Sequence, residues 1–324
     1  MNARAGELFK KLQPLIALGV MIATWSVLSD KFLTLANGRN ILLQISVNLC
    51  LSIGMTLVIL TGGIDLSVGA TLAFAGAFAA GLLKNGLVLK MLGVALQFTP
   101  FGALLAGIAS GLAFGWFNGW VITRFRLPPF VATLGVLSVA RGLTMLWTGG
   151  FPITDLGPQF GFIGAGAWLG VPMPVWISAV LAGIFWGISR RTTLGRYIYA
   201  VGGGEKAAAF SGIGVDRVKI RVYVLGGGLA AVGGLILTAR LDAADPKAGL
   251  GYELDSIAAV VIGGTSLSGG RGSISGTVLG CLIIGVLNDG LFLLDVSPFW
   301  QQVVKGLVIL GAVAVDKMGG RREN

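Results

Sequence analysis

The sequence has 324 residues, of which 55% are apolar and 12% are charged, and its formal net charge is +10. Soluble proteins carry roughly 25% charged residues, so too few polar side chains remain to cover a water-exposed surface, and lipid must be the solvent. The charge does not indicate nucleic-acid binding, because no basic stretch is interleaved with aromatic residues. The absence of histidine and the presence of two cysteines exclude His-based catalysis and His-ligated metal sites and indicate no disulfide framework.

Ten apolar stretches approach the length needed to cross a hydrocarbon core of about 30 Å. They lie at 14–29, 41–61, 64–83, 97–122, 128–148, 172–189, 222–239, 257–264 with its continuation, 276–294 and 299–315. The first lacks an A-x-A-like cleavage site and is expected to be a retained helix. We therefore predict an all-α integral membrane protein, a polytopic bundle of about ten transmembrane helices in a single domain of residues 1–324. Eight or nine crossings would result if a segment is re-entrant.

The distribution of Lys and Arg predicts the orientation, because cytoplasmic loops carry the excess of these residues. Segment 190–221 holds seven basic residues against Glu205 and Asp216. Segment 149–171 has no basic residue, and segment 240–256 has more acidic than basic residues. We therefore expect 190–221 and both termini in the cytoplasm and the other two segments outside. The further basic residues expected inside are Arg4, Lys10, Lys11, Arg124, Arg126, Lys317, Arg321 and Arg322, and the exceptions, expected outside, are Lys84 and Lys90.

Small residues recur every four positions in two of the apolar stretches, which places them on one face of a helix. Such faces let two backbones approach closely in a membrane. Tight helix packing is therefore predicted, with pore lining as the alternative. The two sets are Gly107, Gly111, Gly115 and Gly119, and Gly69, Ala73, Ala77 and Gly81.

A short internal repeat interrupts two apolar stretches. Residues 62–69 read GGIDLSVG and residues 263–270 read GGTSLSGG, so both match G-G-x-x-L-S-x-G. The glycines predict helix breaks, and irregular backbone in a membrane is tolerated only where protein buries it or a wet cavity borders it. Repeats with interrupted helices are typical of transporters, with chance similarity as the alternative for so short a match.

The glycine-rich sequence contains no nucleotide-binding motif. A Walker loop requires Gly-Lys-[Ser/Thr], but residues 202–207 read GGGEKA, and no dinucleotide-binding fingerprint is present. No cofactor or metal is expected. Residues 202–221 instead predict a cytoplasmic loop with a short helix from Glu205 to Ser211, which Gly212 would end. This piece is a candidate docking element for another protein, and a solvated linker is the alternative.

Four ionisable residues lie inside apolar stretches, where a charge is costly unless it is paired or faces water. Asp65 is expected to accept amide hydrogens at the start of a helix near Leu66. Arg141 lies toward the outer half of its helix and is expected to extend to the interface. Asp289 and Lys305 could pair with each other.

Three longer stretches are specific enough to indicate a family. They read GMTLVILTGGIDLSVG at 54–69, TLGRYIYAVGG at 193–203 and GYELDSIAAVVIGGTSL at 251–267. Over nearly its whole length the chain resembles the ribose-type permeases of ABC importers, the branch that takes up ribose, xylose, arabinose and galactose. The resemblance implies a non-catalytic permease subunit of the bacterial inner membrane, with no catalytic residues of its own.

The resemblance also implies partners. Two permeases, identical or paralogous and here expected to form a homodimer in membrane lipid, would enclose the translocation path. A cytoplasmic ATP-binding cassette ATPase would drive transport, and a periplasmic sugar-binding protein would deliver the sugar. The family's docking loop reads G-N-x-x-A-x-x-x-S-G-I, and here Gly204 replaces the Asn. The residues implied to dock into the ATPase, within the loop of about 190–221, are Gly203, Glu205, Ala207, Ala208, Phe210, Ser211, Gly212 and Ile213.

Neutral polar residues suit the passage of a sugar, because hydroxyl groups need donors and acceptors without full charge. Gln44 and Asn48 are four residues apart and share a helix face, which Ser46 cannot join. Hydrogen bonding between helices is the alternative role for such residues. The candidates for the translocation pathway are Gln44, Asn48, Asp65, Ser67, Asn118, Thr265, Ser266 and Asn288, and Gln301 and Gln302 are further candidates.

The sequence therefore predicts a permease subunit that imports a monosaccharide, ribose first, by alternating access with energy from ATP. The alternative is an ion-coupled secondary transporter of a small polar solute. That class usually needs carboxylates inside the membrane, which Asp65 and Asp289 would have to supply. An intramembrane enzyme has little support, because no nucleophile with an adjacent base is evident.

Overall fold

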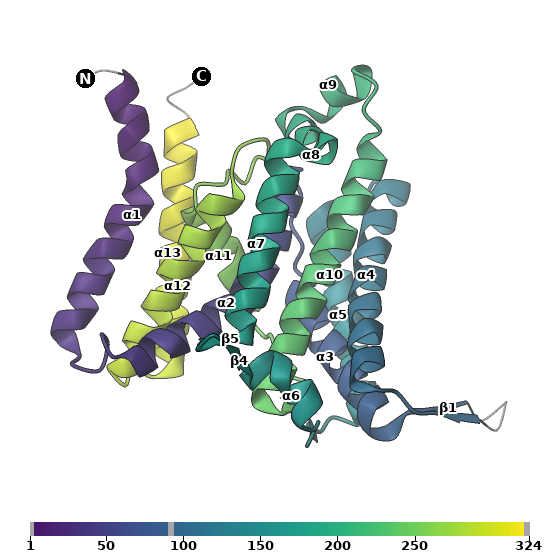
Figure 1. The fold of residues 1–324 in the computed structure, drawn as a ribbon. Coiled ribbons are helices and arrows are strands. Elements are labelled where there is room, and N and C mark those ends of the chain that lie inside the picture. Colours follow the sequence, from purple (N-terminus) through teal and green to yellow (C-terminus); the bar gives the residue numbers. More distant parts are fainter. Residues whose placement is uncertain (1–2, 90–93, 321–324) are drawn as a thin grey trace.

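Figure 1 shows the computed structural model of the chain, a helical bundle in which residues 3–89 and 94–320 are described; Lys90, Arg321 and Arg322 lie outside these residues. The long helices are α1 (Ala3–Leu28), α2 (Leu35–Leu60), α3 (Val68–Asn85), α4 (Pro100–Phe125), α5 (Pro129–Thr148), α7 (Met173–Arg191), α10 (Val215–Leu241), α12 (Ile274–Leu293) and α13 (Pro298–Gly320). The short helices are α6 (Pro158–Ala165), α8 (Thr193–Gly203), α9 (Glu205–Phe210) and α11 (Tyr252–Ile262).

Short antiparallel strand pairs lie toward the end of the bundle opposite to α9, and the hairpin that contains β1 projects away from the helices (Figure 1). Two pairs are local hairpins, and the third joins segments that are far apart in the sequence. The hairpins are β1 (Leu87–Leu89) with β2 (Val94–Leu96) and β4 (Ala167–Trp168) with β5 (Val171–Pro172), and the long-range pair is β3 (Ile153–Thr154) with β6 (Ala243–Ala244).

Each of the ten predicted apolar stretches falls on a helix, namely α1 to α5, α7 and α10 to α13. In the described part of the chain, seven helices are long and apolar enough to cross a membrane: α2, α3, α4, α5, α7, α10 and α12. Among the predicted crossings that are not in this set, α11 is the shortest, with 11 residues. At 1.5 Å per residue, it spans about 16 Å, half of a hydrocarbon core. The prediction of a polytopic all-α bundle is confirmed.

Helix α10 lies at the centre of the bundle, where it packs against α2, α3 and α4. Its contact with α4 depends on glycine. A Cβ atom at Gly111 or Gly115 would clash with a carbonyl oxygen of α10, from Gly227 or Tyr223 respectively, and a Cβ at Gly119 would lie 2.7 Å from the Cα of Ile220. The glycine stripe of α4 is therefore the surface on which two helix backbones touch, which confirms the prediction of tight packing.

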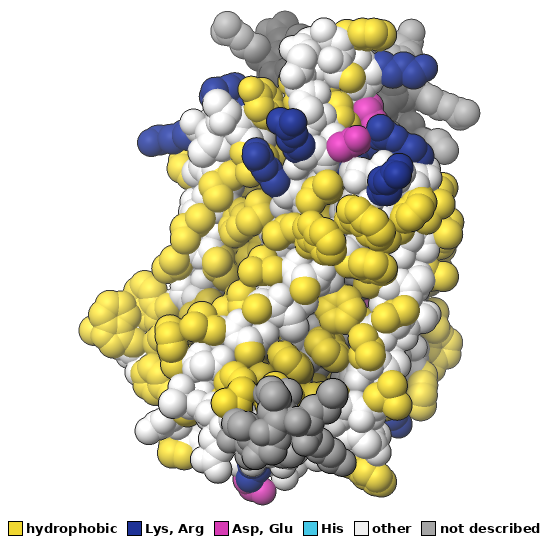
Figure 2. Space-filling model, turned by 90° about the vertical axis from the view of Figure 1, so that its right-hand side faces the viewer, with side chains coloured by type: hydrophobic (Ala, Val, Ile, Leu, Met, Phe, Trp, Pro, Cys, Tyr) yellow, Lys and Arg dark blue, Asp and Glu magenta, His cyan; other side chains and the backbone are white. Residues whose placement is uncertain are grey.

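The two ends of the bundle differ in charge. Both termini and α8 and α9 lie at the upper end in Figure 1. Figure 2 shows that Lys and Arg side chains gather at this end, above a broad hydrophobic belt. The positive-inside rule assigns this end to the cytoplasm, which agrees with the orientation predicted from the sequence. The helices α4, α5 and α7 carry many exposed apolar side chains on the belt, as expected for surfaces that face lipid.

Candidate functional site

The eighth crossing of the bundle is broken. After β6 the chain turns through residues 245–251 and only then forms the short α11. Arg141 of α5 holds this turn, because its Nη1 donates to the carbonyl oxygens of Pro246 at 2.7 Å and Ala248 at 2.8 Å. Arg141 was expected to extend to the outer interface, and its guanidinium reaches the turn that follows β6. There it satisfies carbonyl groups that the non-helical segment leaves without helical partners.

Gly249 brings the same turn against the start of α3. Its φ is +71°, a conformation that favours glycine, and a Cβ there would lie 2.6 Å from the carbonyl oxygen of Gly69. The loop predicted outside at 240–256 thus ends earlier than expected. Residues from Tyr252 onward belong to α11 and lie within the bundle, because this helix packs against α2, α12 and α13.

Helices α2 and α11 each end in a turn with the same hydrogen-bond pattern. Gly62 and Gly264 both have positive φ, +78° and +85°. The next amides, of Gly63 and Thr265, donate at 3.1 Å to the carbonyl oxygens five residues earlier. This is the Schellman pattern of helix termination. The predicted helix breaks are thus present, but the sequence repeat aligns Gly62 with Gly263, whereas the structure pairs it with the next glycine.

A cavity of about 320 Å³ lies among α2, α10, α11, α12 and α13. This volume falls within the range of about 300–1,000 Å³ that is usual for small-molecule sites. Three of the predicted pathway residues line it, Gln44, Asn48 and Asn288, together with Gln301. The remaining lining residues are Ile45, Val47, Leu237, Arg240, Tyr252, Asp255, Gly285, Phe292 and Lys305.

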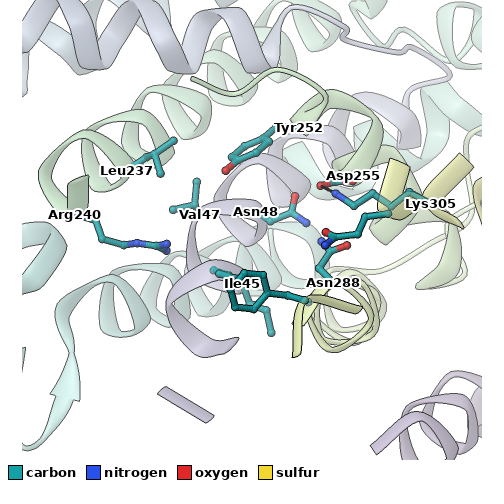
Figure 3. Close-up of a pocket in the computed structure, with 13 residues that line it drawn as sticks. Ile45, Val47, Asn48, Leu237, Arg240, Tyr252, Asp255, Asn288 and Lys305 are labelled. Atoms are coloured by element: carbon teal, nitrogen blue, oxygen red, sulfur yellow. Dashed lines mark hydrogen bonds and ion pairs between the residues drawn. The ribbon is translucent and has the colours of Figure 1, made fainter. Parts of the chain in front are cut away.

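Charged groups lie at the two ends of this cavity, with Asn48 and Tyr252 between them (Figure 3). At one end, Lys305 Nζ and Asp255 Oδ2 form an ion pair at 2.9 Å. At the other end lies Arg240, which makes no ion pair with any described residue. Because the ion pair is neutral as a unit, the polar part of the lining consists of four amide side chains and one phenol with one additional positive charge, and apolar side chains form the rest.

The suggested pairing of Asp289 with Lys305 is wrong. Asp289 accepts a hydrogen bond from Asn37 Nδ2 at 2.7 Å, and Lys305 instead joins α13 to α11 through Asp255. Beside the cavity, Ser256 Oγ of α11 lies 3.3 Å from Asn48 Oδ1 of α2 and shares its one hydrogen with the carbonyl oxygen of Tyr252, at 2.7 Å.

Three other predicted pathway residues form a separate buried network beside the first helix break. Ser67 donates to Asp65 Oδ1 from its backbone amide at 2.9 Å and from its hydroxyl at 2.6 Å. Asn118 Nδ2 of α4 in turn donates to Ser67 Oγ at 2.8 Å. Asp65 was expected to accept amides at the start of a helix near Leu66, but it accepts the amide of Ser67, the residue before α3, and no amide of the helix, which begins at Val68. Thr265 and Ser266 lie in the second break, and neither lines the cavity.

At the cytoplasmic end, α9 stands on the surface between α8 and α10 (Figure 1). Ala208 packs inward, whereas Phe210 is 93% exposed. Gly212, with a φ of +83°, ends the helix as predicted, and the amide of Ile213 donates to the carbonyl oxygen of Ala208 at 3.1 Å. Glu205 accepts from Lys219 of α10 at 2.7 Å, which attaches α9 to the bundle.

An open groove of about 780 Å³ borders α9. Arg126 and Asp216 line this groove and form a bidentate ion pair, with Nη1 to Oδ1 at 2.7 Å and Nη2 to Oδ2 at 3.1 Å. Lys206, Arg217 and Ile213 also line it. The groove therefore combines basic and acidic side chains with an exposed aromatic residue nearby, and aromatic and Arg residues are enriched where proteins bind one another.

A cavity lined by amide side chains inside a bundle with broken helices, together with a protruding cytoplasmic helix that exposes Phe210, defines a membrane transport subunit. The described residues contain no group of three or more metal-ligating side chains. The family model described as the permease component of a branched-chain amino acid transport system matches residues 38–313, and the chain belongs to this family. It is thus a non-catalytic, multi-pass permease of the bacterial inner membrane.

The relatives agree with this assignment. The ribose import permease RbsC of Bacillus subtilis is 49% identical over 311 residues, which cover 95% of this chain and 93% of the relative. The ribose import permease of Escherichia coli K12 is 49% identical over 306 residues, covering 93% and 92%. The xylose permease XylH of Haemophilus influenzae is 36% identical over 366 residues, covering 93% and 94%. These matches remove the ion-coupled secondary transporter from consideration.

A solved ABC transporter of the metal-chelate type, in an inward-facing conformation, has a similar fold. Its TM-score is 0.50 with 14% sequence identity, and the alignment covers 94% of this chain and 98% of the solved chain. At this identity the likeness supports the architecture alone.

Proposed function

We propose that this chain is the permease subunit of an ATP-driven importer of a monosaccharide, with ribose as the first candidate. The observation that carries the proposal is the identity of 49% to ribose import permeases over nearly the full length. The amide side chains of Gln44, Asn48, Asn288 and Gln301 around one cavity support it, because such groups exchange hydrogen bonds with neutral hydroxyls at little electrostatic cost.

The sugar would cross by alternating access, with Gln44, Asn48 and Asn288 forming the translocation pathway. A few neutral hydrogen bonds give weak binding, and conduction requires that the solute both enter and leave. Asp65, Ser67, Asn118, Thr265 and Ser266 would act at the helix breaks, where they support non-helical backbone.

An ATP-binding cassette ATPase would dock on α9 and its groove, through the residues from Gly203 to Ile213. The exposed Phe210 and the charged groove support this surface. A periplasmic sugar-binding protein would dock at the opposite end, near the hairpins and α6. A second copy of the chain would complete the path as a homodimer, with a paralogous permease as the alternative.

Reconstitution tests the proposal. The permease is incorporated into liposomes with an ATPase subunit and a ribose-binding protein, and uptake of radiolabelled ribose is measured. Uptake should require ATP and the binding protein and should persist when an ionophore dissipates ion gradients. Ribose uptake that needs an ion gradient and proceeds without ATP would contradict the proposal. A complex that imports xylose or allose but not ribose would correct the substrate and retain the class.

A further inference from the structure

Three backbone segments meet at the cytoplasmic end of the bundle, and we call their contact the glycine junction. It consists of residues 60–63 at the end of α2, residues 202–203 at the end of α8, and residues 268–272 between α11 and α12. Two of the segments are the helix breaks of the internal repeat, and the third leads directly into α9. The junction therefore joins the exposed cytoplasmic helix to both broken helices.

The two helix breaks are hydrogen-bonded to each other. The amide of Gly270 donates to the carbonyl oxygen of Leu60 at 3.0 Å. The last four carbonyls of a helix lack partners within the helix, so this bond satisfies a group that the end of α2 leaves free. A displacement of the segment 268–272 must therefore either move α2 with it or break this bond inside the protein.

Gly202 packs directly on that hydrogen bond. A Cβ atom at Gly202 would clash with the carbonyl oxygen of Leu60 and would lie 2.5 Å from the amide nitrogen of Gly270. From the other side, a Cβ at Gly269 would lie 3.0 Å from the nitrogen of Gly62 and 3.1 Å from the Cα of Gly202. Three backbones thus touch without intervening side chains, and close-packed contacts of this kind transmit displacement and do not absorb it.

A second attachment holds α8 to the junction. Tyr199 Oη donates to the carbonyl oxygen of Gly272 at 2.9 Å. Burial raises the pKa of this phenol above its ordinary value of 10.0, so the hydroxyl stays protonated and keeps its donor hydrogen. Between α8 and α9 there is one residue, Gly204, whose carbonyl accepts from Ala208 at 2.9 Å. Helix α9 is therefore closely coupled to the end of α8.

The junction also leads to the cavity. Helices α2 and α11 both line it, through Asn48 and Asp255 among others, and they pack directly against each other. At the cytoplasmic end, the segment that follows α11 is tied to the end of α2 by the hydrogen bond from Gly270 to Leu60. Connection at both levels makes them move as a pair.

We propose that the glycine junction transmits the displacement of α9 to α2 and α11, and that Gly202 and Tyr199 are positioning residues that couple ATP hydrolysis to the opening of the cavity. This inference rests on the proposed function, because it requires a motor protein that displaces α9. Neither residue lines the cavity, so their effect is on the ratio of sugar imported to ATP hydrolysed.

The test compares G202A with G187A in the reconstituted complex with ATPase subunit and ribose-binding protein. Gly187 lies inside α7, and a Cβ there meets no atom within 4 Å, so G187A is a matched glycine-to-alanine control. G202A should lower the rate of ribose uptake by about tenfold, equivalent to about 1.4 kcal/mol in the barrier of the transport step, and should lower the ratio of ribose imported to ATP hydrolysed. Co-purification of the ATPase subunit should be unchanged, and the hydrolysis rate should no longer rise when ribose-loaded binding protein is added. G187A should match the wild type.

A second variant keeps the inference open to refutation if G202A does not reach the membrane. Y199F removes only the hydroxyl that contacts Gly272, and it should lower uptake per ATP severalfold at normal membrane abundance. If G202A assembles and imports as much ribose per ATP as the wild type, the inference is wrong. If G202A does not assemble, the inference is wrong when Y199F imports as much ribose per ATP as the wild type. Failure of the proposed function is distinguishable, because it would show in the wild-type complex as a lack of ATP-dependent ribose uptake.

Discussion

The replacement R141M tests whether one side chain holds the broken crossing in place. Methionine keeps much of the length of the side chain but removes the Nη1 donor that binds the carbonyl oxygens of Pro246 and Ala248. The turn at 245–251 then has no charged donor for these two groups. We expect it to open locally while the bundle stays folded.

The magnitude follows from the two lost hydrogen bonds. A hydrogen bond from a charged group contributes about 1.5–3 kcal/mol. Since the Arg141 side chain is only part-buried, the lower value applies to each bond, which gives about 3 kcal/mol for the pair. At 1.4 kcal/mol per factor of ten, the equilibrium constant for opening the turn should rise by about a hundredfold.

Hydrogen exchange with mass spectrometry measures this change directly. The reporter amides are those of Lys247 and Ala248, which donate to Asp245 at 2.8 and 3.0 Å inside the turn. Peptides that contain them should lose protection by about a hundredfold in R141M. Peptides from α10 should be unchanged. R124M, at an exposed arginine near the cytoplasmic end of α4, serves as the control. Unchanged protection of the 245–251 turn in R141M would refute the anchoring role.

Two further replacements test the packing of the bundle and the lining of the cavity. G115A would bring a Cβ onto the carbonyl oxygen of Tyr223, so it should destabilise the protein by about 1–3 kcal/mol in thermal unfolding. The control G142A, where a Cβ meets no atom within 4 Å, should be neutral or slightly stabilising. Equal melting temperatures of the two variants would contradict the account of α4 packing. N48L removes an amide from the cavity and should lower ribose uptake by about tenfold. The control S46A removes a hydroxyl that donates to a carbonyl oxygen of its own helix, and it should transport normally. Normal uptake by N48L would exclude the Asn48 side chain from the pathway.

The architecture was largely predictable because its determinants are local. Apolar stretches, glycine periodicity and the asymmetry of Lys and Arg depend on neighbouring residues, and each of these patterns agrees with the structure. The helical piece that begins at Glu205 and the stop at Gly212 were likewise predicted from local preferences. The helix α6 and the short strand pairs were not predicted, because they are brief and contain no strong periodic pattern.

The charged residues of the membrane region were the least predictable. The partner of Lys305 is Asp255, which the sequence places in an external loop, because nothing local shows that the chain folds back into the bundle after β6. For the same reason, Tyr252 was missed as a cavity residue, and Arg240 was missed because the sequence assigned it to the external loop although it lies in the last turn of α10. The role of Arg141 depends on two carbonyl groups more than 100 residues away in the sequence. Such pairings arise from tertiary contacts. In the sequence, the pair of glycines at 249 and 251 was the only indication that the chain turns at this point.

The central claim, that α9 is the surface on which a cytoplasmic ATPase acts, can be tested by site-specific photo-crosslinking. A photoreactive phenylalanine analogue is placed at Phe210, which is 93% exposed on α9, or at Trp168, which is 58% exposed at the opposite end of the bundle. After illumination of membranes that contain the assembled transporter, the Phe210 protein should form a covalent product with the ATPase subunit, and the Trp168 protein should not. If the ATPase is absent from the Phe210 product, or crosslinks equally from Trp168, the ATPase does not dock on α9 and the proposed coupling is wrong.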